Sequence, residues 1–272
     1  MRSEEINKLN TIAKKVRKEI LLMTSEACGG HYMSSFSSVE ILVSLYFTEL
    51  IFDAGAPDNP DRDRFVLSKG HAAPALYAVM AEAGYFSVNE LKTLRKCGSR
   101  LQGHPVMHRL PGLDTSSGSL GQGISTAVGI ALSGKMDKRK FRVFVLIGDG
   151  ECQEGLVWEA AMSAAHFKLD NLIAIIDKNN LQISGPTENI MSLGDLKAKW
   201  EAFGWTVFNV KGHDIPDLVT TFKKIKTIKN KPIALIADTV KGCGVPFIEN
   251  NLKYHTAPLN EEELIKALDW VE

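Results

Sequence analysis

The sequence lacks a long apolar run. None of its hydrophobic stretches approaches the roughly 20 residues needed to cross a bilayer, and the charged start MRSEEINKLNTIAKKVRKEI lacks the apolar core of a signal peptide. We therefore expect no membrane partner and a cytoplasmic location.

Paired cysteines are absent as well. The chain has 4 cysteines, which are widely separated and form no C-x-x-C pair: Cys28, Cys97, Cys152 and Cys243. A disulfide framework or a cysteine zinc site is therefore not expected, and we interpret these thiols as reduced and mostly buried.

The chain also has no excess of one charge. Lysine plus arginine total 32 and aspartate plus glutamate total 32, so no global field favours nucleic acid, and we expect no nucleic-acid partner. The length of 272 residues and the 44% of hydrophobic residues are sufficient for one large buried core.

Short apolar runs alternate with helix-length segments along the chain. Continuous apolar runs of this length are typical of strands buried on both faces of a parallel sheet. The sequence therefore predicts an α/β fold, a parallel sheet with helices on both faces. The predicted strands are residues 65–67, 143–147, 172–176, 207–210 and 233–237.

Helix signals lie between these strands. Apolar residues at helical spacing between residues 6 and 20 predict an amphipathic helix that ends near Gly29 and Gly30. A capping residue followed three positions later by glutamate predicts further helix starts at Ser37 with Glu40, Ser87 with Glu90, and Asn260 with Glu263. We expect residues 1–272 to form a single domain, whose tail from about 241 to 272 is an extension rather than a second domain.

A glycine-rich acidic turn follows the predicted strand 143–147. Gly148, Asp149 and Gly150 stand where a turn between strand and helix usually cradles phosphate, although a phosphate loop would have lysine in place of Asp149. A helix over about 154–167 and the strand 172–176 complete a βαβ unit. Asp149 and Asn179, which are 30 positions apart, should therefore meet at one edge of the sheet.

Asp149, Asn179 and a backbone carbonyl just beyond it predict a hard ligand set made only of oxygen. Such ligands suit Mg²⁺, which keeps positions open for water and phosphate, and Ca²⁺ also accepts them. A cation there would screen Asp149 from a diphosphate, while Gly150 lets the backbone approach the ligand. Gly-Asp-Gly alone also occurs in ordinary turns, where the aspartate caps the next helix. The asparagine pair at the end of the next strand favours the metal.

Residues 148–180, GDGECQEGLVWEAAMSAAHFKLDNLIAIIDKNN, resemble the thiamine diphosphate binding motif, which begins with Gly-Asp-Gly and ends with Asn-Asn. By this resemblance Asp149, the Asn179 side chain and the Leu181 carbonyl hold the metal, and Gly150 contacts the diphosphate. Within that superfamily the chain is most similar to transketolase. The similar contexts are GGHYM with His31, SKGHAAPALYAVM with His71, QGHP with His104, and YHTAPL with His255.

Further cofactor contacts follow from the same resemblance. The stretch GLDTSSGSLGQGISTAVGIAL resembles the transketolase segment that lines the cofactor. In this match Gly118 and Leu120 stand at the positions that contact thiamine. His71 is assigned to the cofactor as well. Glu154 matches a family glutamate near the cofactor, and Glu159 one near the subunit interface.

The resemblance gives the histidines the catalytic work. Transketolase chemistry needs proton transfer at sugar hydroxyls, which imidazoles perform near neutral pH. The catalytic candidates are His31, His71, His104 and His255, whereas His108, His166 and His213 are interpreted as structural or solvated.

Two further positions need comment: the residues that follow His31, which differ from the family pattern, and Lys241, which lies outside the matched motifs. Tyr32 and Met33 follow His31 where transketolases have a small, Pro/Gly-rich stretch, so we expect a reshaped pocket floor. Lys241 could reach a substrate phosphate, although a lysine at the mouth of a strand is usually solvated.

The resemblance spans nearly the whole chain but only the N-terminal, diphosphate-binding part of transketolase. It implies a second subunit that carries the pyrimidine-binding and C-terminal domains, in an α2β2 assembly acting on sugar phosphates. The implied reaction transfers a two-carbon ketol unit from a ketose phosphate to an aldose phosphate with thiamine diphosphate and Mg²⁺. The alternatives are a subunit of another thiamine diphosphate enzyme, of the 2-oxoacid dehydrogenase alpha or deoxyxylulose-phosphate synthase type, or a noncatalytic regulatory subunit stabilised by the cofactor.

Overall fold

A parallel sheet lies at the centre of the computed structural model, which describes residues 2–272. The strand order is β1-β2-β3-β7-β6, and every neighbouring pair is parallel. The strands are β1 (Arg64–Leu67), β2 (Val143–Gly148), β3 (Leu172–Lys178), β6 (Thr206–Lys211) and β7 (Ile233–Asp238). All the strands predicted from the apolar runs are confirmed.

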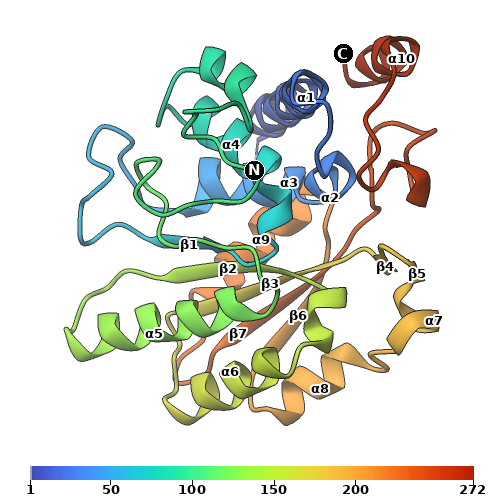
Figure 1. Ribbon diagram of the computed structural model, residues 1–272. Helices are drawn as coiled ribbons and strands as arrows, with labels where there is room; N and C mark the ends of the chain where they lie inside the picture. Colours follow the sequence, from blue (N-terminus) through green and yellow to red (C-terminus); the bar gives the residue numbers. More distant parts are fainter. Residues whose placement is uncertain (1) are drawn as a thin grey trace.

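Helices cover both faces of this sheet (Figure 1). One face packs against α1 (Ser3–Glu26), α2 (Tyr32–Phe36), α3 (Val39–Ser44), α4 (Ala73–Glu82) and α9 (Ile215–Ile225). The other packs against α5 (Gln122–Met136), α6 (Gly155–His166) and α8 (Leu196–Ala202). The predicted α/β fold with helices on both faces is therefore confirmed.

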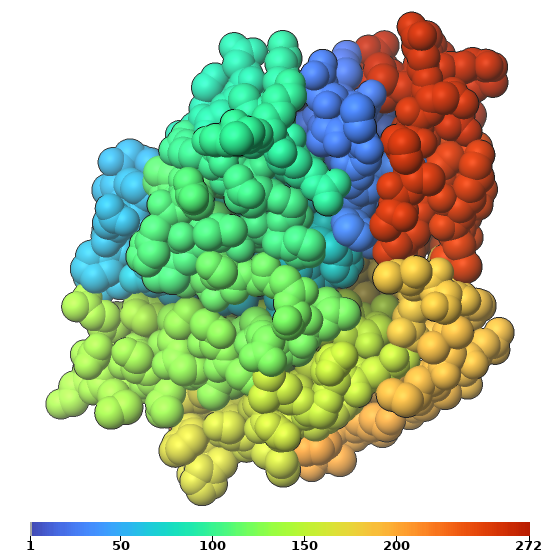
Figure 2. All heavy atoms as spheres, in the orientation of Figure 1, coloured from blue at the N-terminus to red at the C-terminus, as the bar shows by residue number. Residues whose placement is uncertain are grey.

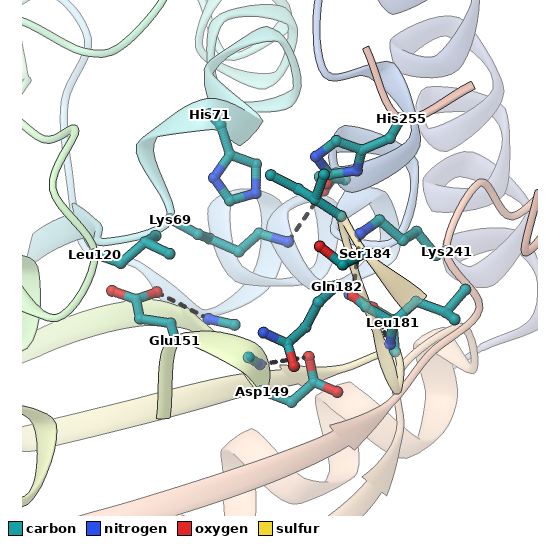
Figure 3. Close-up of a pocket in the computed structure, with 15 residues that line it drawn as sticks. Lys69, His71, Leu120, Asp149, Glu151, Leu181, Gln182, Ser184, Lys241 and His255 are labelled. Atoms are coloured by element: carbon teal, nitrogen blue, oxygen red, sulfur yellow. Dashed lines mark hydrogen bonds between the residues drawn. The ribbon is translucent and has the colours of Figure 1, made fainter. Parts of the chain in front are cut away.

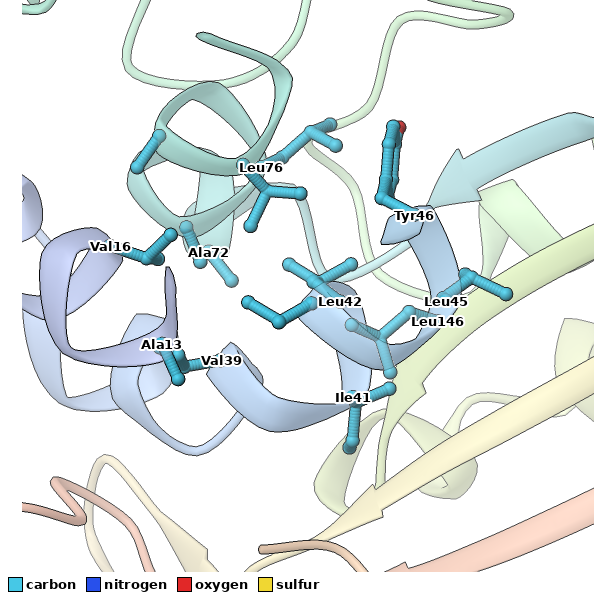
Figure 4. Packing of buried hydrophobic residues seen from close by; sticks show 14 of the residues in the cluster. Ala13, Val16, Val39, Ile41, Leu42, Leu45, Tyr46, Ala72, Leu76 and Leu146 are labelled. Carbon is cyan, nitrogen blue, oxygen red and sulfur yellow. The ribbon is translucent and has the colours of Figure 1, made fainter. Parts of the chain in front are cut away.

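The sheet separates two hydrophobic clusters because successive strand residues point to opposite faces. In β3, Ile173 and Ile175 join the cluster under α1 to α4 and α9, whereas Ala174 and Ile176 join the cluster under α5, α6 and α8. Figure 4 shows part of the first cluster, where Val16 of α1 and Leu76 of α4 lie near the residues of α3. The strands are thus buried on both faces, as their continuous apolar sequence predicts.

Smaller elements complete the chain. After β3 come a short hairpin of β4 (Leu181–Gln182) and β5 (Gly185–Pro186), and then α7 (Thr187–Met191). The C-terminal segment ends in α10 (Glu261–Val271), which packs beside α1. Figure 2 shows this segment in red against the blue N-terminal helices. None of the helices described in residues 2–272 is both long and apolar enough to span a bilayer.

The predicted helix starts meet different outcomes. Asn260 and Glu263 form the expected capping box of α10. Ser87 caps a short 3₁₀ helix by accepting from the Asn89 N–H, but Glu90 pairs with Arg100 instead of closing a box.

The capping box predicted at Ser37 and Glu40 is wrong. The helix α3 begins at Val39, and Ser38 stands at its N-cap. The Ser37 hydroxyl donates to Asp177, and Glu40 forms a bidentate ion pair with Arg17, so both side chains are used by tertiary contacts.

The cysteine prediction is only partly right. All the cysteines are free thiols, but Cys28 and Cys97 are exposed and Cys243 is half-buried. Only Cys152 is fully buried, at the turn after β2, so the expectation of mostly buried thiols is wrong.

Candidate functional site

A cavity of about 270 Å³ lies at the carboxyl ends of the central strands (Figure 3). Open parallel sheets bind ligands at this edge, because the loops that follow the strands converge there. Seven of the residues predicted from the sequence line this cavity: His71, Leu120, Asp149, Gly150, Asn179, Leu181 and His255.

Asp149 and Asn180 connect the ends of β2 and β3. The Asn180 N–H donates to Asp149 Oδ2 at 2.6 Å, and the Gly150 N–H donates to Asp149 Oδ1 at 2.8 Å. Asn180 has a positive φ of 60°, which asparagine tolerates better than most residues. The turn that carries Asp149 therefore meets the asparagine pair, as expected. Asn180 makes the backbone contact and, with its positive φ, forms the turn after β3.

The Asn179 side chain and the Leu181 carbonyl lie on the same loop. The Leu181 N–H donates to Asn179 Oδ1 at 3.1 Å, and Lys241 Nζ donates to the Leu181 carbonyl oxygen at 3.1 Å. Carbonyl and carboxamide oxygens have two lone pairs each, so each retains one for a further partner. At Gly150 a Cβ would stand 2.9 Å from Gln182 Cγ, so a larger residue there would require the Gln182 side chain to move.

This donor set fits a hard divalent cation. It offers a carboxylate, a carboxamide oxygen and a backbone carbonyl, all of which Mg²⁺ and Ca²⁺ accept. It contains a single carboxylate, and no cluster of three or more His, Cys, Asp or Glu arranged to hold a metal is present among residues 2–272. Burial and the nearby Asp177 raise the pKa of Asp149 to about 6, although its backbone hydrogen bonds partly oppose this. A bound cation would favour the ionised carboxylate.

The predicted histidines form one cluster. The His31 ring centroid lies 5.2 Å from that of His71, 5.3 Å from that of His255 and 6.4 Å from that of His104. His71 and His255 belong to the cavity lining, and His31 and His104 adjoin them outside it. Segments more than 200 residues apart, GGHYM and YHTAPL, thus meet at one point.

The imidazoles of this cluster are held neutral. Burial, together with the charges of His104, Arg95 and Lys241, lowers the pKa of His31 to about 4. Burial, Lys241 and His31 likewise lower the pKa of His255 to about 4. Near neutral pH these rings can therefore both donate and accept hydrogen bonds.

The same causes act on the other two rings. Burial and Lys69 hold the pKa of His71 well below its ordinary value, and burial and Arg95 lower the pKa of His104. Arg95 itself lies on the loop after the short helix of residues 88–93, where its Nη1 donates to the Gly29 carbonyl oxygen at 3.3 Å.

Some predicted residues lie outside the cavity lining. Gly118 is on the exposed loop that carries Leu120, and Glu154 is exposed at the start of α6, beside Gly121. Their predicted cofactor contacts stay predictions. Glu159 is also exposed, on α6.

The effect of Tyr32 and Met33 on the pocket floor stays a prediction, and it would have to act through neighbouring residues. Both side chains are buried in the hydrophobic core, and neither belongs to the lining of the cavity. Tyr32 Oη instead donates to the Ala257 carbonyl oxygen at 2.8 Å, and the Gly242 N–H donates to the Met33 carbonyl oxygen at 3.1 Å. The two residues support the segment that carries Lys241 and His255.

Sequence reasoning underestimated Lys241. Only 3% of it is exposed, and it lines the cavity, so the interpretation as a solvated lysine is wrong. Burial and the neighbouring Lys69 lower its pKa to about 8. The signal available in the sequence was its place directly after a buried strand, at the same sheet edge as Asp149.

Other lining residues were missed altogether. Ser34, Lys69, Glu151 and Gln182 all contribute to the cavity. The buried carboxylate of Glu151 accepts from the Gly121 N–H at 2.8 Å, from the Gly148 N–H at 3.0 Å and from the Ser68 hydroxyl. It therefore fixes the loop that carries Leu120 against the turn of Asp149. Nothing in its sequence context distinguishes Glu151 from a solvated helix-start glutamate.

The fold and the site together define a class of protein, a parallel α/β domain with a ligand cavity and an oxygen donor set at the carboxyl edge of its sheet. The chain belongs to the transketolase family: residues 9–269 match the family described as "Transketolase, thiamine diphosphate binding domain". The family predicted from the Gly-Asp-Gly to Asn-Asn motif is confirmed.

Relatives of similar length are named as subunits of transketolases. The chain is 40% identical over 272 residues to a subunit of the apulose-4-phosphate transketolase of Phocaeicola vulgatus, covering 98% of this chain and 96% of that protein. It is 43% identical over 260 residues to the 6-deoxy-6-sulfo-D-fructose transketolase subunit SqwG of Clostridium sp. strain MSTE9, covering 96% and 94%.

Longer transketolases match over part of their length. Human transketolase is 43% identical over 269 residues, which cover 97% of this chain and 42% of that protein. The crystal structure of Campylobacter jejuni transketolase superimposes with a TM-score of 0.93 at 33% identity, over 100% of this chain and 43% of that one. The chain thus spans about two fifths of these transketolases.

Proposed function

We propose that this chain is the diphosphate-binding subunit of a heteromeric transketolase. The observation that carries the proposal is one cavity edge where the oxygens of Asp149, Asn179 and Leu181 stand beside a cluster of neutral histidines. The reaction is transfer of a two-carbon ketol unit from a ketose phosphate to an aldose phosphate.

Asp149, the Asn179 side chain and the Leu181 carbonyl would hold Mg²⁺, and Gly150 would admit the diphosphate. This assignment is supported by the oxygen-only ligands and by the place of Gly150, which has no side chain, in the cavity lining beside them. The bound thiamine diphosphate would supply a nucleophilic carbon and take up the electron pair released when the sugar carbon–carbon bond breaks. The protein must then orient the sugar and move its protons.

The histidine cluster suits that work. A neutral imidazole can accept a proton from a sugar hydroxyl and return it later, and such assistance is worth roughly 10²–10⁴-fold in rate. His71 and His255 line the cavity directly, while His31 and His104 extend the cluster along it. Arg95 beside His104 gives this end a cation that would favour an anionic sugar.

A second polypeptide would complete the site. Relatives of the same length are named as subunits, whereas human transketolase is more than twice as long, since only 42% of it is matched. The partner would carry the pyrimidine-binding and C-terminal domains and the glutamate that activates the cofactor, in an α2β2 assembly. Ile183, which is 69% exposed, and Leu120, which is 37% exposed, line the cavity and would pack against that partner.

A reconstitution assay tests the proposal. The chain is mixed with a candidate partner chain that carries the pyrimidine-binding and C-terminal domains, with thiamine diphosphate and Mg²⁺, and ketol transfer from xylulose 5-phosphate to ribose 5-phosphate is followed. The anionic ketoses named for the relatives, apulose 4-phosphate and 6-deoxy-6-sulfofructose, serve as further donors. We expect transfer with at least one donor and none when either chain is omitted. Turnover of pyruvate without ketol transfer would overturn the proposal.

A further inference from the structure

A buried ion pair that none of the assigned roles uses lies in the wall of the cavity. Lys69 follows β1 and is 2% exposed, and Asp177 near the end of β3 is 0% exposed. Lys69 Nζ donates to Asp177 Oδ2 across 108 positions of the sequence. Burying two charges costs free energy even when they pair, so such a pair is weak support for stability and calls for another explanation.

Every oxygen of the Asp177 carboxylate has a partner. Oδ2 also accepts from the Ser37 hydroxyl at 2.6 Å, and Oδ1 accepts from the Thr239 hydroxyl after β7. The backbone of Asp177 also takes part, because its carbonyl oxygen accepts from the Asp149 N–H at 3.1 Å. The carboxylate therefore has one geometry, fixed from the ends of α2, β1 and β7 at once.

Lys69 is held less completely. Besides Asp177, its ammonium donates to the Ser34 carbonyl oxygen at 3.0 Å. An ammonium has three N–H donors, and within residues 2–272 no third acceptor lies within hydrogen-bonding distance of Lys69 Nζ. Lys69 belongs to the cavity lining, and Figure 3 shows its side chain extending into the space between His71 and Lys241.

Two ammonium groups thus face one small cavity. Lys69 and Lys241 are both buried, and no carboxylate forms an ion pair with Lys241 among the described residues. Both side chains line the same cavity of about 270 Å³. Lys69 is paired with Asp177, whereas Lys241 has no carboxylate of its own among the described residues, so an anion beside the two ammonium groups would supply the charge that Lys241 lacks.

The geometry points to Lys69 as an anion-binding residue of the cavity, whose third N–H donates to the diphosphate of the ligand, and to Asp177 as the positioning residue that aims it. The inference rests on the proposed function for the identity of the ligand. The ion pair then holds the donor in place before the ligand arrives, so binding requires no reorganisation of this side chain.

Variants of the pair separate positioning from stability. Lys69→Met leaves Asp177 buried and unpaired, and the double variant Lys69→Met/Asp177→Leu replaces the pair with apolar side chains, which often restores stability. Arg142→Met is the matched control. It removes the cation of another largely buried pair, with Glu49 and Asp63, at the opposite end of β2.

The full chain is titrated with inorganic pyrophosphate and Mg²⁺ by calorimetry, and thermal unfolding is recorded for each variant. We expect Lys69→Met and the double variant to weaken pyrophosphate binding at least tenfold, with Tm recovered in the double variant. Arg142→Met should lower Tm and leave the affinity unchanged.

Two results would overturn the inference. One is wild-type pyrophosphate affinity in the double variant, which would make the pair purely structural. The other is absence of pyrophosphate binding by the wild-type chain, which would overturn the diphosphate site as well. If Lys69→Met loses pyrophosphate binding but the reconstituted wild-type enzyme shows no ketol transfer, this inference stands and only the proposed reaction is removed.

Discussion

At the scale of single residues, Asp149 connects the turn after β2 with the turn after β3. Both of its oxygens accept backbone N–H groups, and each retains a lone pair for a cation. We expect Asp149→Ala to weaken Mg²⁺-dependent binding of thiamine diphosphate by at least about 100-fold, measured by calorimetry on the reconstituted complex. Asp238→Ala is the control, because Asp238 is exposed at the end of β7. Equal affinity of both variants would contradict the metal assignment.

His104 is the histidine of the cluster that can be tested with least effect on the cofactor, because it lies outside the cavity lining. His104→Ala removes one proton-transfer group, so kcat should fall at least about tenfold while the affinity for thiamine diphosphate is kept. His166→Ala, at the exposed end of α6, should leave kcat unchanged. A kcat for His104→Ala that matches the His166 variant would remove His104 from the catalytic candidates.

The residues differ in how well the sequence predicts them. Asp149 and Asn179 were predictable because the carboxyl ends of neighbouring parallel strands must meet. Lys69 and Asp177 were not, since the chain has 32 basic residues and nothing local distinguishes the few that are buried, such as Lys69 and Lys241. Their partners come from distant segments, and only the folded chain brings them together.

At the scale of elements, a local sequence pattern predicts a strand or a helix cap correctly where no tertiary contact competes for the same side chains. The strands follow directly from their apolar runs, and the capping box at Asn260 forms at the exposed start of α10. The box predicted at Ser37 and Glu40 does not form because both side chains have buried partners elsewhere. The Ser37 hydroxyl donates to Asp177, and the Glu40 carboxylate pairs with Arg17. Such competition cannot be seen in a window of a few residues.

Tyr32 shows how an element supports the site without touching it. Its hydroxyl is the partner of the Ala257 carbonyl, two residues beyond His255. Tyr32→Phe should lower the free energy of unfolding by about 1–2 kcal/mol, because a part-buried carbonyl loses its donor. Urea unfolding measures this loss, and Tyr85→Phe, whose hydroxyl donates to no residue within 2–272, is the control. Equal stability of the two variants would contradict the supporting role.

At the scale of the whole molecule, we infer that the described residues 2–272 make one domain with an extension from about 241 to 272. One hydrophobic cluster runs from Leu9 of α1 to Val271 of α10. Lys14 Nζ donates to the Glu272 carbonyl oxygen at 2.8 Å, and Lys18 pairs with the Glu272 side chain. The extension brings His255 to the cavity, so it contributes to the site rather than forming a separate unit.

The histidine cluster also gives the molecule a pH-dependent stability. Each of its rings has a folded pKa below the ordinary value of about 6.5, to about 4 for His31 and His255. Between these values the unfolded chain binds protons that the folded chain does not, so stability falls as pH falls from about 6.5 to about 4. Asp149 and Glu151 act in the opposite direction, because their folded pKa values are raised.

Four histidines outnumber the three carboxyl groups whose folded pKa is raised, Asp149, Glu151 and Glu19, so we expect the Tm of the metal-free chain to fall steadily between pH 6.5 and pH 4.5. Differential scanning calorimetry at several pH values measures the slope. In the variant His31→Asn/His255→Asn, two of the titrating rings are gone, and the slope should be clearly shallower even if the Tm at pH 7.5 has changed. A slope equal to that of the wild type would mean that groups elsewhere in the chain control its acid stability, since the linkage depends only on proton uptake by the folded and unfolded states.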